Sequence, residues 1–296
     1  MSQQNTYSRG ILMSGVGMLI LTPDGLLLRL VGETSTWNVI FYRSVFLASA
    51  LGVFLLIRER GSLASVFRNF ERASWISTLL MTASNLCFVI AINNTSVANT
   101  LVLVATMPFF SAVLGWLLIG EPVKPRTWVS ILFAIIGIFI IFSGSFGGGN
   151  WLGDLLAITT AFLMALNLVV LRKARGKDVT IPALWVSGIL AALIVLPLAQ
   201  PMEVNSTDLF YLAIMGLCIV PLSLVLFLGG ARYAPAAEIA LLALIETVLG
   251  PLWVWIGVGE VPSSMALIGG SIVIGSIFLN AWFGIKSHKN KSRQEA

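Results

Sequence analysis

The chain has 296 residues, of which 57% are hydrophobic and only 10% are charged. Soluble domains carry about 25% charged residues because their surface faces water, so this composition excludes an ordinary soluble protein. The net charge of +5 does not indicate a nucleic-acid partner, because the basic residues are placed as membrane topology requires.

Long apolar segments predict a chain that crosses the membrane many times. A helix needs about 20 apolar residues to cross about 30 Å of hydrocarbon. By this criterion the ten predicted transmembrane helices cover residues 10–30, 36–57, 74–94, 97–119, 127–145, 151–171, 180–198, 208–229, 236–257 and 263–284. The connections are short, the longest being 58–73, so no loop can hold a soluble domain. The predicted fold class is therefore an all-α membrane protein.

Basic residues occur in alternate connections of this helix order. If the N terminus is cytoplasmic, all Lys and Arg except Arg29 and Arg43 lie in or beside cytoplasmic segments, and the opposite connections carry only acidic charges. This is the positive-inside bias of membrane proteins. We therefore predict a multi-pass protein of the inner membrane with both termini in the cytoplasm. The segment 10–30 is too long for a signal-peptide core, so we expect it to be retained as a membrane helix.

The sequence contains an internal repeat. A shift of 139 residues aligns 98–139 with 237–278 and pairs Trp116 with Trp255, Gly120 with Gly259 and Glu121 with Glu260. A shift of 143 residues pairs Gly10 with Gly153 and Arg29 with Arg172. The halves are therefore 1–146 and 150–296, and each contains five predicted helices. Because five is odd, the second half must enter the membrane inverted, and inverted repeats are typical of secondary transporters.

Short motifs accompany this repeat. They are Gly120-Glu121 and Gly259-Glu260 at the end of the fourth helix of each half, Phe41-Tyr42-Arg43-Ser44 in the second helix, and Ile245-Glu246-Thr247-Val248 with Pro251-Leu252-Trp253 in the ninth. With the repeat, these motifs resemble the EamA-type branch of the drug/metabolite transporter superfamily. The resemblance implies that 1–146 and 150–296 are two EamA-like five-helix repeats around a central cavity, which work by alternating access. It does not imply a particular substrate.

Three charged residues stand out inside predicted helices, where each costs about 2.5–3.5 kcal/mol on insertion scales. Asp24 and Arg43 have similar estimated depths on helices joined by a short loop, so we predict an ion pair. This pair either locks two helices together or forms part of the cavity wall or an outer gate. Glu246 lies near the midplane, and no Lys or Arg is predicted at its depth. It is interpreted as a proton carrier, as the counter-charge of an amine, or as a protonated carboxyl group bonded to a neighbouring helix.

Other polar residues are candidates for the same site. Asn167 corresponds to Asp24 under the repeat shift and is a candidate for the gate on the cytoplasmic side. Tyr42, Asn85 and Trp253 are candidates for the cavity wall. Prolines inside predicted helices free backbone carbonyl groups, which either line a cavity or bend the helix for packing; they are Pro23, Pro108, Pro221 and Pro251.

The function predicted from these features is that of a secondary transporter for a small polar metabolite. One basic and two acidic membrane groups suit an amino acid or an amine better than a dianion, while sugars and nucleosides stay open as substrates. The expected mode is export or proton-coupled exchange. The alternatives are an ion-conducting channel and a membrane-embedded sensor. No GxxxxGK[ST] or HExxH motif occurs, and the single His288 lies in the tail, so we expect no enzyme activity, cofactor or metal site. Expected partners are the substrate, protons and the lipid bilayer, with a monomer or homodimer as the assembly.

Overall fold

The structure is a computed structural model that describes residues 3–32, 34–59, 63–68, 70–120, 125–145, 150–174, 179–199, 203–276 and 279. All regular elements within these residues are helices, as the sequence predicts. They are α1 (Gln3–Leu21), α2 (Asp24–Leu30), α3 (Thr36–Arg58), α4 (Leu63–Arg68), α5 (Arg72–Asn94), α6 (Val97–Val104), α7 (Met107–Ile119), α8 (Pro125–Ser145), α9 (Trp151–Lys173), α10 (Thr180–Val195), α11 (Ser206–Ile214), a π-helical turn (Met215–Ile219), α12 (Val220–Gly230), α13 (Ala236–Leu241) and α14 (Leu244–Val258).

Seven segments are long and apolar enough to cross a membrane, and they make the chain a multi-pass membrane protein. These segments are Tyr7–Leu30, Thr36–Arg58, Arg72–Asn94, Val97–Ile119, Trp151–Lys173, Ser206–Gly230 and Ala236–Val258. Shorter apolar helices cover Trp128–Ile141, Thr180–Val195 and Ser264–Ser276. Together these follow the predicted segments in chain order, but three of them fall short of a full span, so the count of ten stays a prediction. The short helix α4 occupies part of the connection that the sequence predicts as a loop.

Several predicted helices are interrupted, and prolines explain part of the pattern. Pro23 directly precedes α2, and Pro108 lies in the first turn of α7, where its missing N–H costs nothing. Pro221 follows the π-helical turn, which absorbs the break in the hydrogen-bond ladder. Pro251 differs, because α14 continues through it.

The interruption between α13 and α14 instead falls at Leu242 and Ala243. Backbone hydrogen bonds between residues three apart form tight turns there, from Ala243 N to Ala240 O at 3.1 Å and from Glu246 N to Ala243 O at 3.1 Å. Such turns are common where one helix ends and the next begins. The break therefore directly precedes Glu246.

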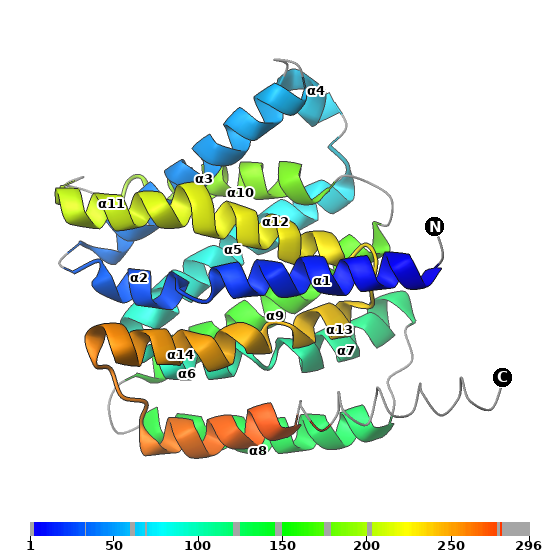
Figure 1. The fold of residues 1–296 in the computed structure, drawn as a ribbon, viewed down its shortest axis with the longest axis vertical. Helices are drawn as coiled ribbons and strands as arrows, with labels where there is room; N and C mark the ends of the chain where they lie inside the picture. Colours follow the sequence, from blue (N-terminus) through cyan, green and yellow to red (C-terminus); the bar gives the residue numbers. More distant parts are fainter. Residues whose placement is uncertain are drawn as a thin grey trace.

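The helices form a bundle whose elements lie side by side in pairs (Figure 1). The most extensive packing joins α5 to α9 and α1 to α12, followed by α3 with α10. The segments α6–α7 and α13–α14 also pack together, and α2 packs on α14. A Cβ on Gly17 would lie 2.6 Å from the carbonyl oxygen of Ser223, so α1 and α12 approach as closely as only glycine permits.

The surface is apolar and the interior contains charged groups. Ile57, Phe139 and Ile256 are 77%, 72% and 75% exposed, whereas Asp24 and Arg43 are 0% and 5% exposed. This distribution is the reverse of that in a soluble protein, and lipid is the solvent that such a surface requires.

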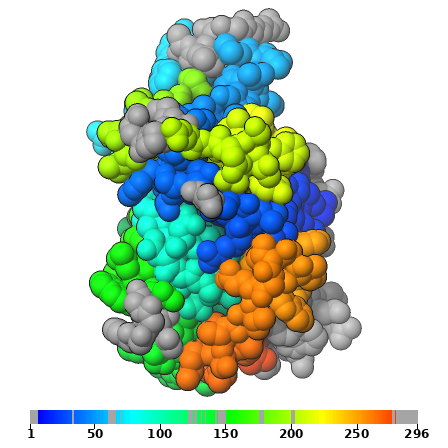
Figure 2. All heavy atoms as spheres, turned by 90° about the vertical axis from the view of Figure 1, so that its left-hand side faces the viewer, coloured from blue at the N-terminus to red at the C-terminus, as the bar shows by residue number. Residues whose placement is uncertain are grey.

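The bundle has two ends. We call the end where α2 and α14 end and α6 and α11 begin the distal end; it lies on the left of Figure 1, and the opposite end, where α1 begins, is the proximal end. Figure 2 looks directly onto the distal end and shows the blue, cyan and orange segments meeting there in contact.

Candidate functional site

Asp24 and Arg43 form the ion pair that the sequence predicts. Arg43 Nη2 donates to Asp24 Oδ2 at 2.7 Å, and both side chains are buried. Asp24 is the first residue of α2, directly after the break at Thr22 and Pro23, and Arg43 lies in the first half of α3. The interruption of the first helix thus places a carboxylate against the second helix.

This ion pair uses only part of its hydrogen-bonding capacity. Asp24 Oδ1 and both Arg43 Nε and Nη1 are buried and have no hydrogen-bond partner among the described residues. A buried polar atom without a partner costs about 1–3 kcal/mol, so packing of two helices alone does not account for this arrangement. The unused groups comprise donors suited to a carboxylate and an acceptor suited to an ammonium group.

Glu246 lies within electrostatic range of this pair, whereas the sequence predicts no Lys or Arg at its depth. It is 7% exposed and interacts electrostatically with both Asp24 and Arg43. The reason is the packing of α2 on α14, which brings the ninth helix beside the first. We call Asp24, Arg43 and Glu246 the charged centre. It has one basic and two acidic groups inside the membrane-spanning bundle.

Two hydrogen bonds from residues that follow Glu246 hold α14 in place. Thr247 Oγ1 donates to the carbonyl oxygen of Leu101 in α6 at 3.2 Å. Trp253 Nε1 donates to Thr22 Oγ1 at 3.2 Å, at the break between α1 and α2. Trp253 is 44% exposed, so its ring also faces outward from the bundle. These bonds join the interrupted first, fourth and ninth helices beside the charged centre.

Tyr42 directly precedes Arg43 in α3, and Asn85 lies in α5, which packs on α3. Asn85 Nδ2 donates to Ser44 Oγ at 3.4 Å, and Ser44 follows Arg43 in α3. The ring of Tyr42 packs edge-on against Phe41, with centroids 5.4 Å apart. Their place in a cavity wall stays a prediction.

Asn167 has its amide group engaged by α5. Its Oδ1 accepts from Ser77 Oγ at 2.7 Å, its Nδ2 lies 3.0 Å from Met81 Sδ, and the residue is 0% exposed. These contacts join α9 to α5. The predicted role of Asn167 in a gate stays a prediction, and this geometry assigns the residue to a helix–helix contact.

Comparison with known proteins bears directly on this arrangement. The model of the EamA-like transporter family matches residues 9–143 and 151–282. The chain belongs to the EamA-like transporter family. This confirms the resemblance to drug/metabolite transporters that the sequence motifs indicate.

Three relatives of this EamA-family chain carry transporter names. The uncharacterized transporter YdfC of Bacillus subtilis (strain 168) is 25% identical over 185 residues, which are 59% of this chain and 59% of that protein. An uncharacterized transporter of Clostridium kluyveri is 26% identical over 202 residues, 63% of this chain and 64% of that protein. An uncharacterized transporter of Synechocystis sp. is 24% identical over 279 residues, 86% of this chain and 78% of that protein. The match thus spans less than two thirds of the first two relatives.

A solved structure shares the fold of this EamA-family chain. A crystal structure of another protein has a TM-score of 0.70 and 16% sequence identity, and the match covers 91% of this chain and 96% of that one. At this identity the likeness concerns the fold alone.

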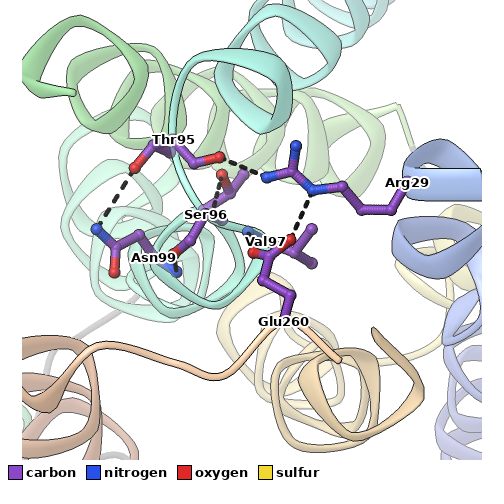
Figure 3. Close-up of polar contacts among 7 residues, drawn as sticks. Arg29, Thr95, Ser96, Val97, Asn99 and Glu260 are labelled. Carbon is purple, nitrogen blue, oxygen red and sulfur yellow. Dashed lines mark hydrogen bonds and ion pairs between the residues drawn. The ribbon is translucent and has the colours of Figure 1, made fainter. Parts of the chain in front are cut away.

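The EamA-family chain has a second polar cluster, at the distal end, which sequence reasoning missed (Figure 3). Arg29 Nε lies 2.8 Å from Glu260 Oε2, and Arg29 Nη2 donates to the carbonyl oxygen of Thr95 at 2.7 Å. Glu260 Oε1 accepts from Val97 N at 3.0 Å. The contact was missed because Arg29 and Glu260 lie in opposite halves of the sequence, and no local pattern pairs them.

Asp154 extends this cluster into the bundle. It lies in the first turn of α9, is 0% exposed, and its Oδ1 accepts from Thr95 Oγ1 at 2.9 Å. Its Oδ2 is buried without a hydrogen-bond partner among the described residues. The signal in the sequence was an acidic residue just inside a predicted membrane helix, which is rare enough to mark a candidate.

Proposed function

We propose that the protein is a secondary transporter that moves a small polar metabolite, of amino acid or amine type, across the inner membrane by alternating access. Export or proton-coupled exchange is the proposed mode. The observation that carries the proposal is the charged centre. Asp24, Arg43 and Glu246 gather inside a membrane-spanning bundle, and ionisable groups at such positions mark substrate or proton pathways.

The chemistry of the charged centre favours a zwitterion or an amine over a dianion. Arg43 Nε and Nη1 are donors that suit a substrate carboxylate, and Asp24 and Glu246 suit an ammonium group. Two acidic groups against one basic group would repel a second negative charge on the substrate. Glu246 is proposed either to bind the amine or to carry a proton during exchange.

The packing of the helices supports two inverted repeats over residues 1–146 and 150–296. In the repeat, the first predicted helix corresponds to the sixth and the third to the eighth. The first packs on the eighth as α1 on α12, and the sixth packs on the third as α9 on α5. Exchanging the halves therefore converts one contact into the other.

The remaining helix contacts are also preserved when the two halves are exchanged. The second and seventh helices, α3 and α10, pack on each other, as do the fourth and ninth, α6–α7 and α13–α14. Each of these pairs maps onto itself when the halves are exchanged, as expected for helices on a pseudo-two-fold axis. Inverted repeats around such an axis are the architecture from which alternating access follows.

A ligand screen by thermal stabilisation tests the proposal. A ligand that binds the native state stabilises it by about 2.7 kcal/mol at 100 times its Kd. Amino acids, amines and dicarboxylates are compared on the purified protein, and a zwitterion or an amine is expected to raise the melting temperature. Glu246→Gln should weaken stabilisation by amines, and Arg43→Lys should weaken stabilisation by compounds with a carboxylate.

The same screen can contradict the proposal. Stabilisation by dicarboxylates alone would overturn the substrate class. In reconstituted vesicles, a carrier shows saturable flux with counter-flow, whereas ion conductance without saturation or counter-flow indicates a channel. Such conductance would favour the channel alternative over the transporter.

A further inference from the structure

The distal cluster joins three helix ends that are far apart in the sequence (Figure 3). Arg29 lies at the end of α2, Thr95 and Val97 flank the turn between α5 and α6, and Glu260 follows α14. Together the bonds of Arg29 and Glu260 connect the first helix, the turn between the third and fourth helices, and the end of the ninth helix.

Each partner in this cluster satisfies a helix terminus. The Arg29 guanidinium donates to the carbonyl oxygen of Thr95, which follows the last residue of α5, and a cation is favourable at the C-terminal end of a helix. The Glu260 carboxylate accepts from the N–H of Val97, the first residue of α6, where an anion is favourable. The C-terminal end of α5 therefore binds Arg29 and the N-terminal end of α6 binds Glu260, while Arg29 and Glu260 also bind each other at 2.8 Å.

The cluster is partly exposed at the end of the bundle, unlike the charged centre. The side chains of Arg29 and Glu260 are 25% and 27% exposed, whereas those of Arg43 and Asp24 are 6% and 1% exposed. Water can therefore solvate both charges when they separate, which keeps the cost of breaking this pair small. A contact that must open and close repeatedly needs that property, and the buried pair lacks it.

We infer that the ion pair between Arg29 and Glu260 holds the distal end of the bundle closed and breaks when this end opens. We call this ion pair the latch. The inference rests on the alternating-access part of the proposed function. In the latched form, α2 and α14 are held to the turn between α5 and α6. Separation of α14 from this turn requires the bonds of Glu260 to Arg29 and to Val97 to break together.

The internal repeat provides a separate observation. Under the repeat shifts, Arg29 corresponds to Arg172 and Glu260 corresponds to Glu121. The same two charge types therefore recur with their halves exchanged, as an inverted repeat requires of a contact made between the halves. Glu121 lies outside the described residues, and the inference concerns the distal pair alone.

Distance measurement between spin labels tests the latch. Asn93 and Val261 are exposed residues beside Thr95 and Glu260, on the two sides of the contact. Asn93→Cys and Val261→Cys are introduced into the full chain after its two native cysteines are replaced by Cys87→Ala and Cys218→Ala, so that nitroxide labels attach only at the new sites. The labelled protein is measured in liposomes. Wild type is expected to show mainly the short distance of the closed end.

Neutral variants should shift this distribution. Arg29→Gln, and separately Glu260→Gln, should raise the ratio of long to short distances about three- to tenfold, the range expected for a partly exposed pair with two backbone bonds. Glu260→Gln keeps an oxygen that can accept from Val97 N, so its effect isolates the charge. Arg58→Gln is the matched control, because Arg58 Nε lies 3.5 Å from Glu59 Oε1 at the end of α3, outside the distal cluster, and it should leave the distribution unchanged.

The outcome that overturns the latch is an unchanged distance distribution in both neutral variants. If Arg29→Gln does not fold, Glu260→Gln alone tests the latch. This variant is expected to fold because Glu260 follows the end of α14 and its side chain is partly exposed. Wild-type protein in the same liposomes is also tested for flux of the compound that stabilises it in the thermal screen. This measurement separates the latch from the proposed function. With saturable flux and unchanged distances only the latch fails, whereas absence of flux overturns the proposed function.

Discussion

Arg43 forms an ion pair with one carboxylate, and its other hydrogen-bond donors are not used in that pair. Its Nη2 binds Asp24 at 2.7 Å, while Nε and Nη1 are buried without a hydrogen-bond partner among the described residues. Removal of one partner from a buried ion pair costs about 3–5 kcal/mol, because the other charge remains uncompensated in a low dielectric. Both Asp24 and Arg43 should therefore tolerate single neutralisation poorly, whatever their role in transport.

A double-mutant cycle measures this coupling. Asp24→Asn and Arg43→Gln should each lower the free energy of unfolding by about 3–5 kcal/mol, and the double variant should lose less than the sum by about 1–3 kcal/mol. Reversible denaturation in detergent gives the three values. The control is Arg58→Gln with Glu59→Gln, a pair whose side chains are 37% and 29% exposed and which should contribute less than about 1 kcal/mol. Strictly additive losses for Asp24 and Arg43 would show that the ion pair does not form.

Among the helices, the α1–α12 contact depends on small residues. A Cβ at Gly17 would lie 2.6 Å from Ser223 O and 2.7 Å from Phe227 N, and both are backbone atoms that cannot rotate away. Gly15, on the same helix, has nothing within 4 Å of such a Cβ. The two glycines thus differ in their surroundings and share their helix, which makes them a matched pair.

Alanine substitutions at these two positions should have opposite effects. Gly17→Ala forces the helices apart and should destabilise the protein by about 1–3 kcal/mol, as overpacking does. Gly15→Ala meets no atoms and should be neutral or stabilising by about 0.5–1 kcal/mol through the helix backbone. Melting temperatures of the purified variants give the comparison. Equal shifts for both substitutions would contradict the close approach of α1 and α12.

The sequence could predict elements and local pairs better than the assembly of distant helices. Asp24 and Arg43 were predicted to pair because a short loop joins their helices and their depths agree. The position of Glu246 beside them was not predicted, because it depends on α14 packing against α2. The break at Leu242 and Ala243 was also missed, because Pro251 was the visible interruption and the helix continues through it.

For the whole molecule, the distribution of basic residues leads to a specific topology. We propose that both termini and the proximal end are cytoplasmic and that the distal end faces outward. Asn205→Cys, beside α11 at the distal end, should then react with an impermeant thiol reagent in intact cells. Gly176→Cys, in the basic connection 172–177, should react only after the membrane is opened. The reverse pattern would show that the orientation is wrong.

The central claim is that the charged centre binds the substrate or carries the coupling proton. Glu246→Gln keeps the shape and one oxygen of the side chain but removes its charge, and Glu59→Gln is a matched change at the end of α3. Flux into proteoliposomes is measured with and without a pH gradient for both variants and for wild type. We predict that Glu246→Gln abolishes flux driven by the gradient or weakens substrate affinity at least about tenfold, a loss of about 1.4 kcal/mol, and that Glu59→Gln matches wild type. Unchanged affinity and unchanged pH dependence in Glu246→Gln would contradict the claim and make Glu246 a structural residue.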